Sequence, residues 1–302
     1  MDLVPYFKSS TGLNTKVDPT RIGYDPETGV SDLALAVNIT HDDTGRPYRR
    51  NGYELLQTGS YHSLFCDGGD CFVGIGKGLW QVGTDYSLTG VRGDLSGSRI
   101  GFLQRGSETY YCNDFQNGVI KNGQSFNWPT GIHEGPETTR QFSEAPIGRH
   151  IAFFNGRWYI SQGNTVWISE PFAPGLFDMA RGFLQFKSAI RMIKPVKEGI
   201  FISDSKAIWF FRGTDPSEFS QKQLTAYPVL EWSDAIDYIE GYEIGLETPG
   251  LCALWGTVEG AMIGTTDGRV VTLTKDKIQY PKIGSQGSGL LRGNRFIHSM
   301  FF

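Results

Sequence analysis

The sequence predicts an all-β fold, a β-propeller of about six blades with a range of five to seven. One reason is composition: of 302 residues 39 are glycine and 13% are aromatic, which is typical of many short strands joined by tight turns. The other is a repeated unit of an apolar run, a glycine turn and a second apolar run. Because one such hairpin cannot bury its own apolar face, neighbouring copies must supply the core.

The first-turn glycine of each unit recurs about every 45 residues on average, which matches one four-stranded propeller blade. These marker glycines are Gly69, Gly106, Gly156, Gly199, Gly260 and Gly293. The longest interval predicts an insertion at residues 215–250. Its apolar residues fit helical spacing and strand alternation equally well, but Gly241 and Gly245 disfavour a helix, so we expect a strand.

The two ends of the repeat region complement each other. The last unit, residues 290–302, holds only half of a blade, and residues 32–59 read as two strands around the turn Asp43-Thr44-Gly45. We expect this N-terminal hairpin and the C-terminal strands to close the ring, which leaves no long sheet edge open. The predicted domains are therefore an extended arm, residues 1–31, and one propeller, residues 32–302.

The arm is rich in turn residues and has no sustained periodicity. We expect it to lie on the outside of the propeller or on a neighbouring subunit. Its predicted docking residues are Pro5, Tyr6, Phe7 and Tyr24.

The sequence offers little for catalysis, so we expect no enzyme, no cofactor and no metal site. Five histidines are scattered singly, and the acidic residues of the insertion lie on one local segment with nothing to make them converge in a cleft. The net charge of −4 gives no basic stripe for sequence-specific nucleic-acid binding. No signal peptide and no 18-residue apolar run is present, so we expect synthesis in the host cytoplasm and no membrane insertion.

Two small features remain. Cys66 and Cys71 flank Asp67-Gly68-Gly69-Asp70, and a two-residue Gly-Gly hairpin would bring their Cα atoms to roughly 4.5 Å at a non-hydrogen-bonded pair. That distance allows a cross-strand disulfide, although the cytosol favours a reduced pair. The densest basic spot, a candidate for salt bridges to an acidic partner, comprises Arg46, Arg49 and Arg50.

Several segments resemble tailed-bacteriophage virion β-propeller proteins of the tail-nozzle, tail-hub and packaged-DNA-stabilisation type. The matching segments are 12–15 (GLNT), 34–38 (ALAVN), 42–45 (DDTG), 49–53 (RRNGY), 245–255 (GLETPGLCALW) and 267–271 (DGRVV).

The resemblance implies a non-enzymatic structural component of the virion neck or tail, such as a head-tail connector, tail hub or nozzle-like protein. It implies a homo-oligomeric ring near the DNA conduit, with portal, adaptor or other tail proteins as partners. The mild negative charge would let DNA pass during ejection without sticking. The chain is shorter than the nozzle proteins, which favours a compact adaptor, hub or tail-decorating protein. The alternative is a propeller that binds or hydrolyses glycans during host attachment.

Overall fold

The structure is a computed structural model, and it describes residues 9–25, 27–42, 44–133, 140–240, 249–280, 284–292 and 295–300. The described part is built from β-strands, and its helices are two 3-10 turns, η1 (Pro19–Arg21) and η2 (Pro216–Glu218). In the described part of the chain, no helix has the length and apolar character needed to cross a membrane. The expected all-β class is therefore confirmed.

Five antiparallel sheets follow one another along the chain, and in all but the third the strands are ordered as they occur in the sequence. The first contains β6 (Tyr61–Asp67), β7 (Asp70–Ile75), β8 (Gly78–Val82) and β9 (Leu88–Arg92). The second contains β10 (Gly101–Arg105), β11 (Glu108–Cys112), β12 (Asn117–Lys121) and β13 (Gln124–Phe126). The third contains β15 (Ile151–Phe154), β16 (Arg157–Gln162), β17 (Thr165–Glu170) and β19 (Phe183–Gln185), and β17 also pairs with β18 (Ala173–Asp178), which carries β14 (Phe142–Ser143).

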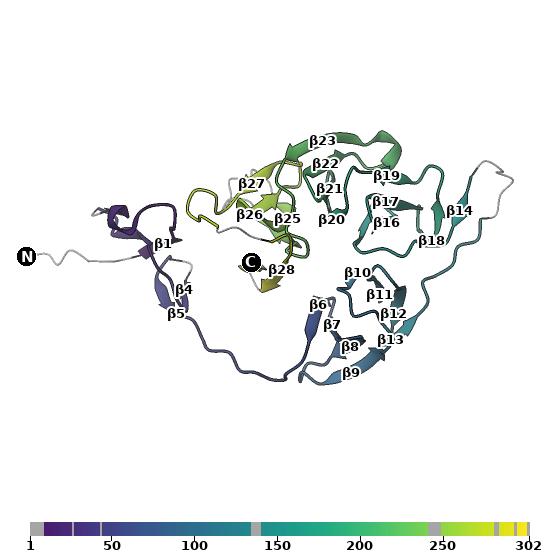
Figure 1. The fold of residues 1–302 in the computed structure, drawn as a ribbon, viewed down its shortest axis with the longest axis horizontal. Helices are drawn as coiled ribbons and strands as arrows, with labels where there is room; N and C mark the ends of the chain where they lie inside the picture. Colours follow the sequence, from purple (N-terminus) through teal and green to yellow (C-terminus); the bar gives the residue numbers. More distant parts are fainter. Residues whose placement is uncertain are drawn as a thin grey trace, which may run out of the picture.

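The fourth sheet contains β20 (Ile190–Val196), β21 (Gly199–Asp204), β22 (Ile208–Arg212) and β23 (Ser220–Thr225). The fifth contains β24 (Ala235–Ile239), β25 (Gly250–Thr257), β26 (Gly260–Gly264) and β27 (Val270–Thr272). The sixth has two described strands, β28 (Gly287–Arg292) and β29 (Arg295–Met300). These sheets follow an arc, and the first and sixth lie at its two ends (Figure 1).

The N-terminal strands lie to one side of this arc (Figure 1). A small sheet is formed by β1 (Ser9–Leu13), β3 (Val30–Leu33) and β2 (Tyr24–Asp25), in that order, with β1 parallel to β3. The expected boundary between arm and propeller, after residue 31, falls within β3. The next two strands, β4 (Ile39–His41) and β5 (Pro47–Arg49), pair with each other.

The hairpin turns follow from the sequence. Asn155 and Gly156 join β15 to β16 with φ values of 44° and 82°, and Gly68 and Gly69 join β6 to β7 with φ values of 57° and 93°. Two successive positive φ angles define the type I′ turn, whose twist matches that of the flanking strands and which favours Asn-Gly and Gly-Gly. The predicted pairing of Cys66 with Cys71 is confirmed by the strand register.

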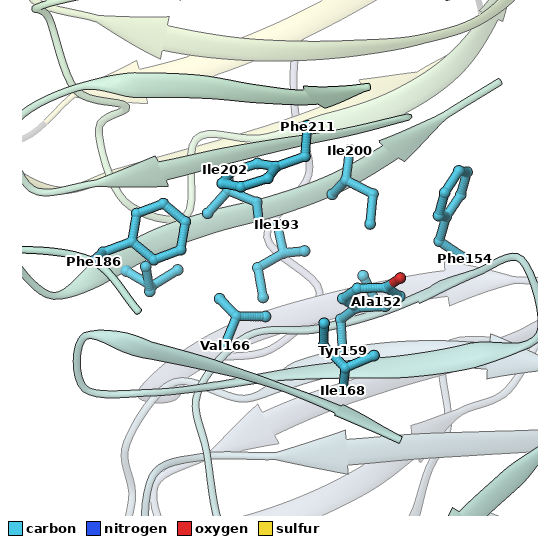
Figure 2. Packing of buried hydrophobic residues seen from close by; sticks show 11 residues of the cluster. Ala152, Phe154, Tyr159, Val166, Ile168, Phe186, Ile193, Ile200, Ile202 and Phe211 are labelled. Atoms are coloured by element: carbon cyan, nitrogen blue, oxygen red, sulfur yellow. The ribbon is translucent and has the colours of Figure 1, made fainter. Parts of the chain in front are cut away.

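The core consists of apolar clusters between successive sheets, one at each of the five interfaces from the first sheet to the sixth. Figure 2 shows the cluster between the third and fourth sheets, where Val166 and Tyr159 face Ile193 and Ile202. Alternate residues of each strand point to the neighbouring sheet, so every middle sheet is covered on both faces. Stacking of repeated sheets therefore buries the apolar residues that single hairpins cannot bury.

Three expectations on individual segments can be compared with the structure. The strand expected in the insertion is confirmed for β24, and residues 241–248 lie outside the described part. The proline and glycine residues of segment 170–182 predict a loop with one short helical turn, but this segment contains the strand β18. The N-terminal hairpin forms as expected, but β4 and β5 share no ladder with β29, so the described strands do not close the ring. Its turn residue Asp43 lies outside the described part.

Candidate functional site

A cavity of about 900 Å³ lies at the centre of the arc, where the first strands of the sheets begin. All six sheets contribute to its lining, together with the segment that links β5 to β6. Polar and charged residues of the lining include His62, Arg99, His150, Lys194, Asp234 and Ser288. Tyr86 and Leu56 line the cavity and are exposed, so it opens to solvent on the side of the first sheet. Its volume falls within the range of small-molecule sites.

An ion pair crosses the centre between sheets that are not neighbours. Arg149 directly precedes the third sheet and Glu231 precedes the fifth. Nη2 of Arg149 donates to Oε2 of Glu231 at 3.0 Å. Nε of Arg149 also lies 2.8 Å from Oε1 but is not aligned for a hydrogen bond, so Nη2 makes the directed contact. Nη1 of Arg149 donates to Asp114 of the second sheet at 2.9 Å. One guanidinium therefore ties three sheets together.

His150 and Trp232 complete this cluster. Nε2 of His150 lies 3.3 Å from Oε1 of Glu231, and the rings of His150 and Trp232 are 4.5 Å apart. Burial opposes ionisation of Glu231, but the hydrogen bond with His150 and the charges of Arg149 and Arg191 outweigh it and lower the pKa of this carboxyl. Glu231 is therefore ionised at neutral pH and does not hold the proton that a general acid needs.

Strained backbone gathers at the cavity. Ser63, Tyr86 and Trp232 all line it, and their φ values are 55°, 64° and 70°. Non-glycine residues in this left-handed region carry a cost of about 1–3 kcal/mol each and persist where the surrounding structure holds them. Such strain is commonly found at functional sites.

A second contact crosses the centre from the second sheet to the sixth. Nη1 of Arg99 donates to the carbonyl oxygen of Gly287 at 2.7 Å, and Nη2 donates to Oγ of Ser288 at 3.2 Å. Burial lowers the pKa of Arg99, and the positive charge of Arg149 adds to this effect. Arg99 therefore links β28 of the sixth sheet to the segment that precedes the second sheet.

Two further charged residues of the lining, Lys194 and Asp234, form an ion pair. Nζ of Lys194 lies 2.8 Å from Oδ2 of Asp234. Retaining and inverting glycosidases need a protonated acid and a second carboxylate that flank the substrate. Glu231 and Asp234 are both engaged in ion pairs. Within the described ranges, no three His, Cys, Asp or Glu side chains gather as metal ligands.

The residues singled out from the sequence lie elsewhere. Pro5, Tyr6 and Phe7 lie outside the described residues, and Tyr24 is exposed on β2. Cys66 and Cys71 are joined by a disulfide at the tip of the first sheet, with Cα atoms 4.1 Å apart.

The basic spot of Arg46, Arg49 and Arg50 is exposed on the N-terminal hairpin. Its described contacts include the Arg50 guanidinium over the ring of Tyr53, at 4.6 Å from the ring centroid. Whether the spot meets an acidic partner stays a prediction.

Sequence reasoning missed the central cluster. A signal was present, because Arg99, Arg149 and Arg191 occur at or just before the start of the first strand in three consecutive sheets. A charge that recurs at one position of a repeat on the inner strand indicates a shared location near the axis. Its partner Glu231 carries no such signal.

Comparison with known proteins adds only weak similarities. No protein-family model matches the chain, and no curated protein sequence matches it.

Among solved structures, an extracellular domain assigned to a hybrid two-component system from B. thetaiotaomicron is 15% identical over 80% of this chain and 31% of that chain, with a TM-score of 0.49. A catalytically inactive variant of virginiamycin B lyase from Staphylococcus aureus, with quinupristin, is 11% identical over 82% and 85% of the two chains, with a TM-score of 0.48. Hsv2p of Kluyveromyces lactis is 11% identical over 70% and 62%, with a TM-score of 0.40. Similarities at this level do not indicate a function.

Proposed function

We propose that this chain is a non-enzymatic structural component of a tailed-phage virion, located in the neck or tail and acting by assembly. The proposal starts from the segments that resemble phage virion propellers. Two features of the described residues support it: the central carboxylates are held in ion pairs, and the N-terminal part carries apolar side chains that lack cover. An assembly part needs surfaces for partners more than it needs reactive groups.

The exposed apolar residues carry the proposal. Leu35, Val37, Tyr53 and Leu55 are exposed within one short stretch of chain before the first sheet. Single exposed apolar residues are common, whereas a contiguous exposed patch marks an interaction surface, and we infer that these four residues belong to such a surface. We propose that copies of the chain form a closed ring, with the arm docked on the adjacent subunit.

We also propose that the six sheets form a closed six-bladed propeller. Four of the first five sheets have four strands and the third adds two more, whereas the sixth has two described strands and the N-terminal hairpin provides two more. Together they would complete a sixth blade of the same size. A closed ring of blades also protects the edges of all its sheets.

Native mass spectrometry and light scattering of the purified full-length chain test this role at micromolar concentration. We expect a homo-oligomer of defined size that also co-sediments with phage particles. A chain that stays strictly monomeric and never accompanies particles would rule the proposal out.

The glycan-binding alternative has one observation in its favour, the central cavity. Tyr61, Tyr86 and Trp232 offer aromatic faces beside hydroxyl, imidazole and charged groups. Such a mixture suits a ligand with both apolar and hydrogen-bonding faces. A screen against cell-surface polysaccharides tests it, and selective binding that is lost in Trp232→Ala would favour this alternative over the assembly role.

A further inference from the structure

We propose that the N-terminal module, residues 9–49, of one copy docks on the fifth and sixth sheets of the adjacent copy in the ring, through the same contacts that it makes within one chain. Such an exchange of an identical element between subunits is a domain swap. The exchange presupposes the ring of copies proposed above. It adds the surface that receives the module and the residue pair that selects it.

The receiving surface is centred on residues 274–280, the docking segment, which the fifth sheet holds in place. The amides of Lys277 and Ile278 donate to the carbonyl oxygen of Thr274 at 3.1 and 2.8 Å, which folds the segment into a turn. Oγ1 of Thr274 accepts from the amide of Ala261 on β26 at 3.0 Å and lies 3.0 Å from the hydroxyl of Tyr280. The docking segment is therefore anchored by contacts outside the N-terminal module.

The N-terminal module matches this turn in shape and charge. The amide of Thr15 donates to the carbonyl oxygen of Lys277, and Oγ1 of Thr15 accepts from the amide of Gln279, each at 2.8 Å. Nζ of Lys277 donates to Oδ1 of Asp32 at 2.9 Å and to the carbonyl oxygen of Thr11 at 3.0 Å. Backbone contacts therefore set the register of the docked module, and one ion pair sets its charge.

The carboxylate of Asp32 is prepared for a cation by the module itself. Nδ2 of Asn14 donates to Oδ2 of Asp32 at 2.8 Å, and the hydroxyl of Thr11 donates to Oδ1. These two hydrogen bonds, with a further contribution from Lys277, lower the pKa of Asp32 to about 2. Because Asn14 and Thr11 belong to the module, the module carries an ionised, oriented carboxylate to whichever copy it docks on.

The contacts between the module and the rest of the chain are polar. On the sixth sheet, Nη2 of Arg295 donates to the carbonyl oxygen of His41 at 3.0 Å, and Nη1 donates to Oγ1 of Thr40. The five apolar clusters contain no described residue before Phe65. The module can therefore leave its own chain without opening the apolar core, and docking on another copy restores every hydrogen bond.

The linker between the module and the first sheet favours exchange over docking within one chain. Residues 51–60 are all exposed, and they include Tyr53, Leu55 and Leu56 at 71%, 76% and 61%. A module docked on its own chain leaves these apolar side chains in solvent. In an exchanged ring the linker crosses from one subunit to the next, so these side chains lie at a subunit boundary, where apolar surface is commonly found.

The two sides of the contact belong to opposite ends of the arc (Figure 1). The linker attaches the module to the first sheet, whereas the docking segment follows the fifth sheet and Arg295 lies on the sixth. A contact between two different surfaces of the same chain is heterologous, and its repetition produces a ring when the rotation closes. Exchange of the module therefore supplies the kind of interface that the proposed ring needs.

Cysteine cross-linking of the purified full-length chain tests the exchange. Thr15→Cys and Gln279→Cys place one thiol on each side of the contact, at two exposed positions whose hydrogen bond holds them together. The natural cysteines are buried or form the disulfide. After treatment with a short bismaleimide, the double variant should give a ladder of covalent multimers on a denaturing gel.

Thr15→Cys combined with Lys222→Cys is the matched control, because Lys222 is exposed on β23 of the fourth sheet, outside the docking surface. The Gln279 variant should form at least about tenfold more multimer than this control, because docking raises the effective concentration of its two thiols. Co-expression of the two single variants, Thr15→Cys and Gln279→Cys, should also yield a cross-linked dimer with one chain of each kind. Absence of that dimer would overturn the exchange.

The ion pair is tested by Lys277→Asp, which places a carboxylate opposite Asp32. We expect the oligomer to dissociate at a concentration at least about tenfold higher than that of the unmodified chain, because like charges then face each other across the interface. Lys275→Asp makes the same change of charge at an exposed residue of the same turn and should leave the oligomer intact. Equal effects of the two variants would refute the selecting role of the pair.

Native mass spectrometry of the unmodified chain separates the exchange from the proposed function. An oligomer whose double-cysteine variant links only within single chains refutes the exchange and leaves the assembly role standing. A monomer whose double-cysteine variant links only within single chains refutes the exchange and counts against the assembly role as well.

Discussion

Replacing Glu231 by glutamine should destabilise the protein at neutral pH, because the substitution removes the negative charge between Arg149 and His150. The side chain of Glu231 is 11% exposed, that of His150 is 7% exposed and that of Arg149 is 34% exposed. Removing one partner of a buried pair costs about 3–5 kcal/mol. Solvent reaches Arg149 and glutamine keeps the shape of the side chain, so we expect about 2–3 kcal/mol.

For a chain of this length each kcal/mol lowers the melting temperature by about 2 °C, so the expected decrease is about 5 °C at pH 7. The pH dependence gives a second test. The folded-state pKa of Glu231 lies below the ordinary value of 4.5, so its stabilisation is complete above about pH 4.5 and is lost as the pH falls through the folded-state pKa. The difference between the two proteins should therefore shrink in acid.

Differential scanning calorimetry from pH 3 to pH 8 measures both effects, with Glu144→Gln as a control at an exposed carboxylate. The control should melt within about 1 °C of the unmodified protein. An equally small effect of Glu231→Gln at pH 7, or a decrease that stays constant into acid, would refute the role given to the central ion pair.

Three further predictions concern single positions. Arg99→Ala should release β28, so that protease cuts the C-terminal strands faster while the first five sheets stay resistant; equal cleavage rates would contradict the link. Gly101→Ala should cost about 1–3 kcal/mol, because its Cβ would lie 2.5 Å from a carbonyl oxygen, whereas Gly23→Ala, with open space around it, should be neutral in the same denaturant titration. Cys66 and Cys71 should resist alkylation until a reductant is added, and intact mass spectrometry would reveal free thiols if the disulfide were absent.

The parts of the fold that sequence reasoning predicted are those set by local chemistry. The two glycines Gly68 and Gly69 specify a tight turn. This turn sets the strand register that pairs Cys66 with Cys71. Gly69, Gly106, Gly156 and Gly199 lie at or beside the turn between the first two strands of a sheet, whereas Gly260 follows the turn between the second and third strands of the fifth sheet. Local turn geometry and apolar alternation were therefore sufficient to locate the sheets.

The central cluster was not predictable in the same way. Arg149 and Glu231 are separated by 82 residues and belong to sheets that are not neighbours, so their meeting depends on the curvature of the whole arc. Periodicity places a residue on the inner strand but does not say which residue lies opposite. The missing ladder between the N-terminal hairpin and β29 has a similar origin, because the pairing of a hairpin is local whereas closure depends on how the two ends of the arc are placed.

The assembly role is tested most directly by cryo-electron microscopy combined with mass spectrometry of purified tailed particles from a phage that encodes this chain. The account predicts the chain in fixed stoichiometry in the neck or tail, with density for six blades in each copy and the hairpin of β4 and β5 completing the sixth blade. Particles that lack the chain, while it accumulates free in the lysate, would contradict the account.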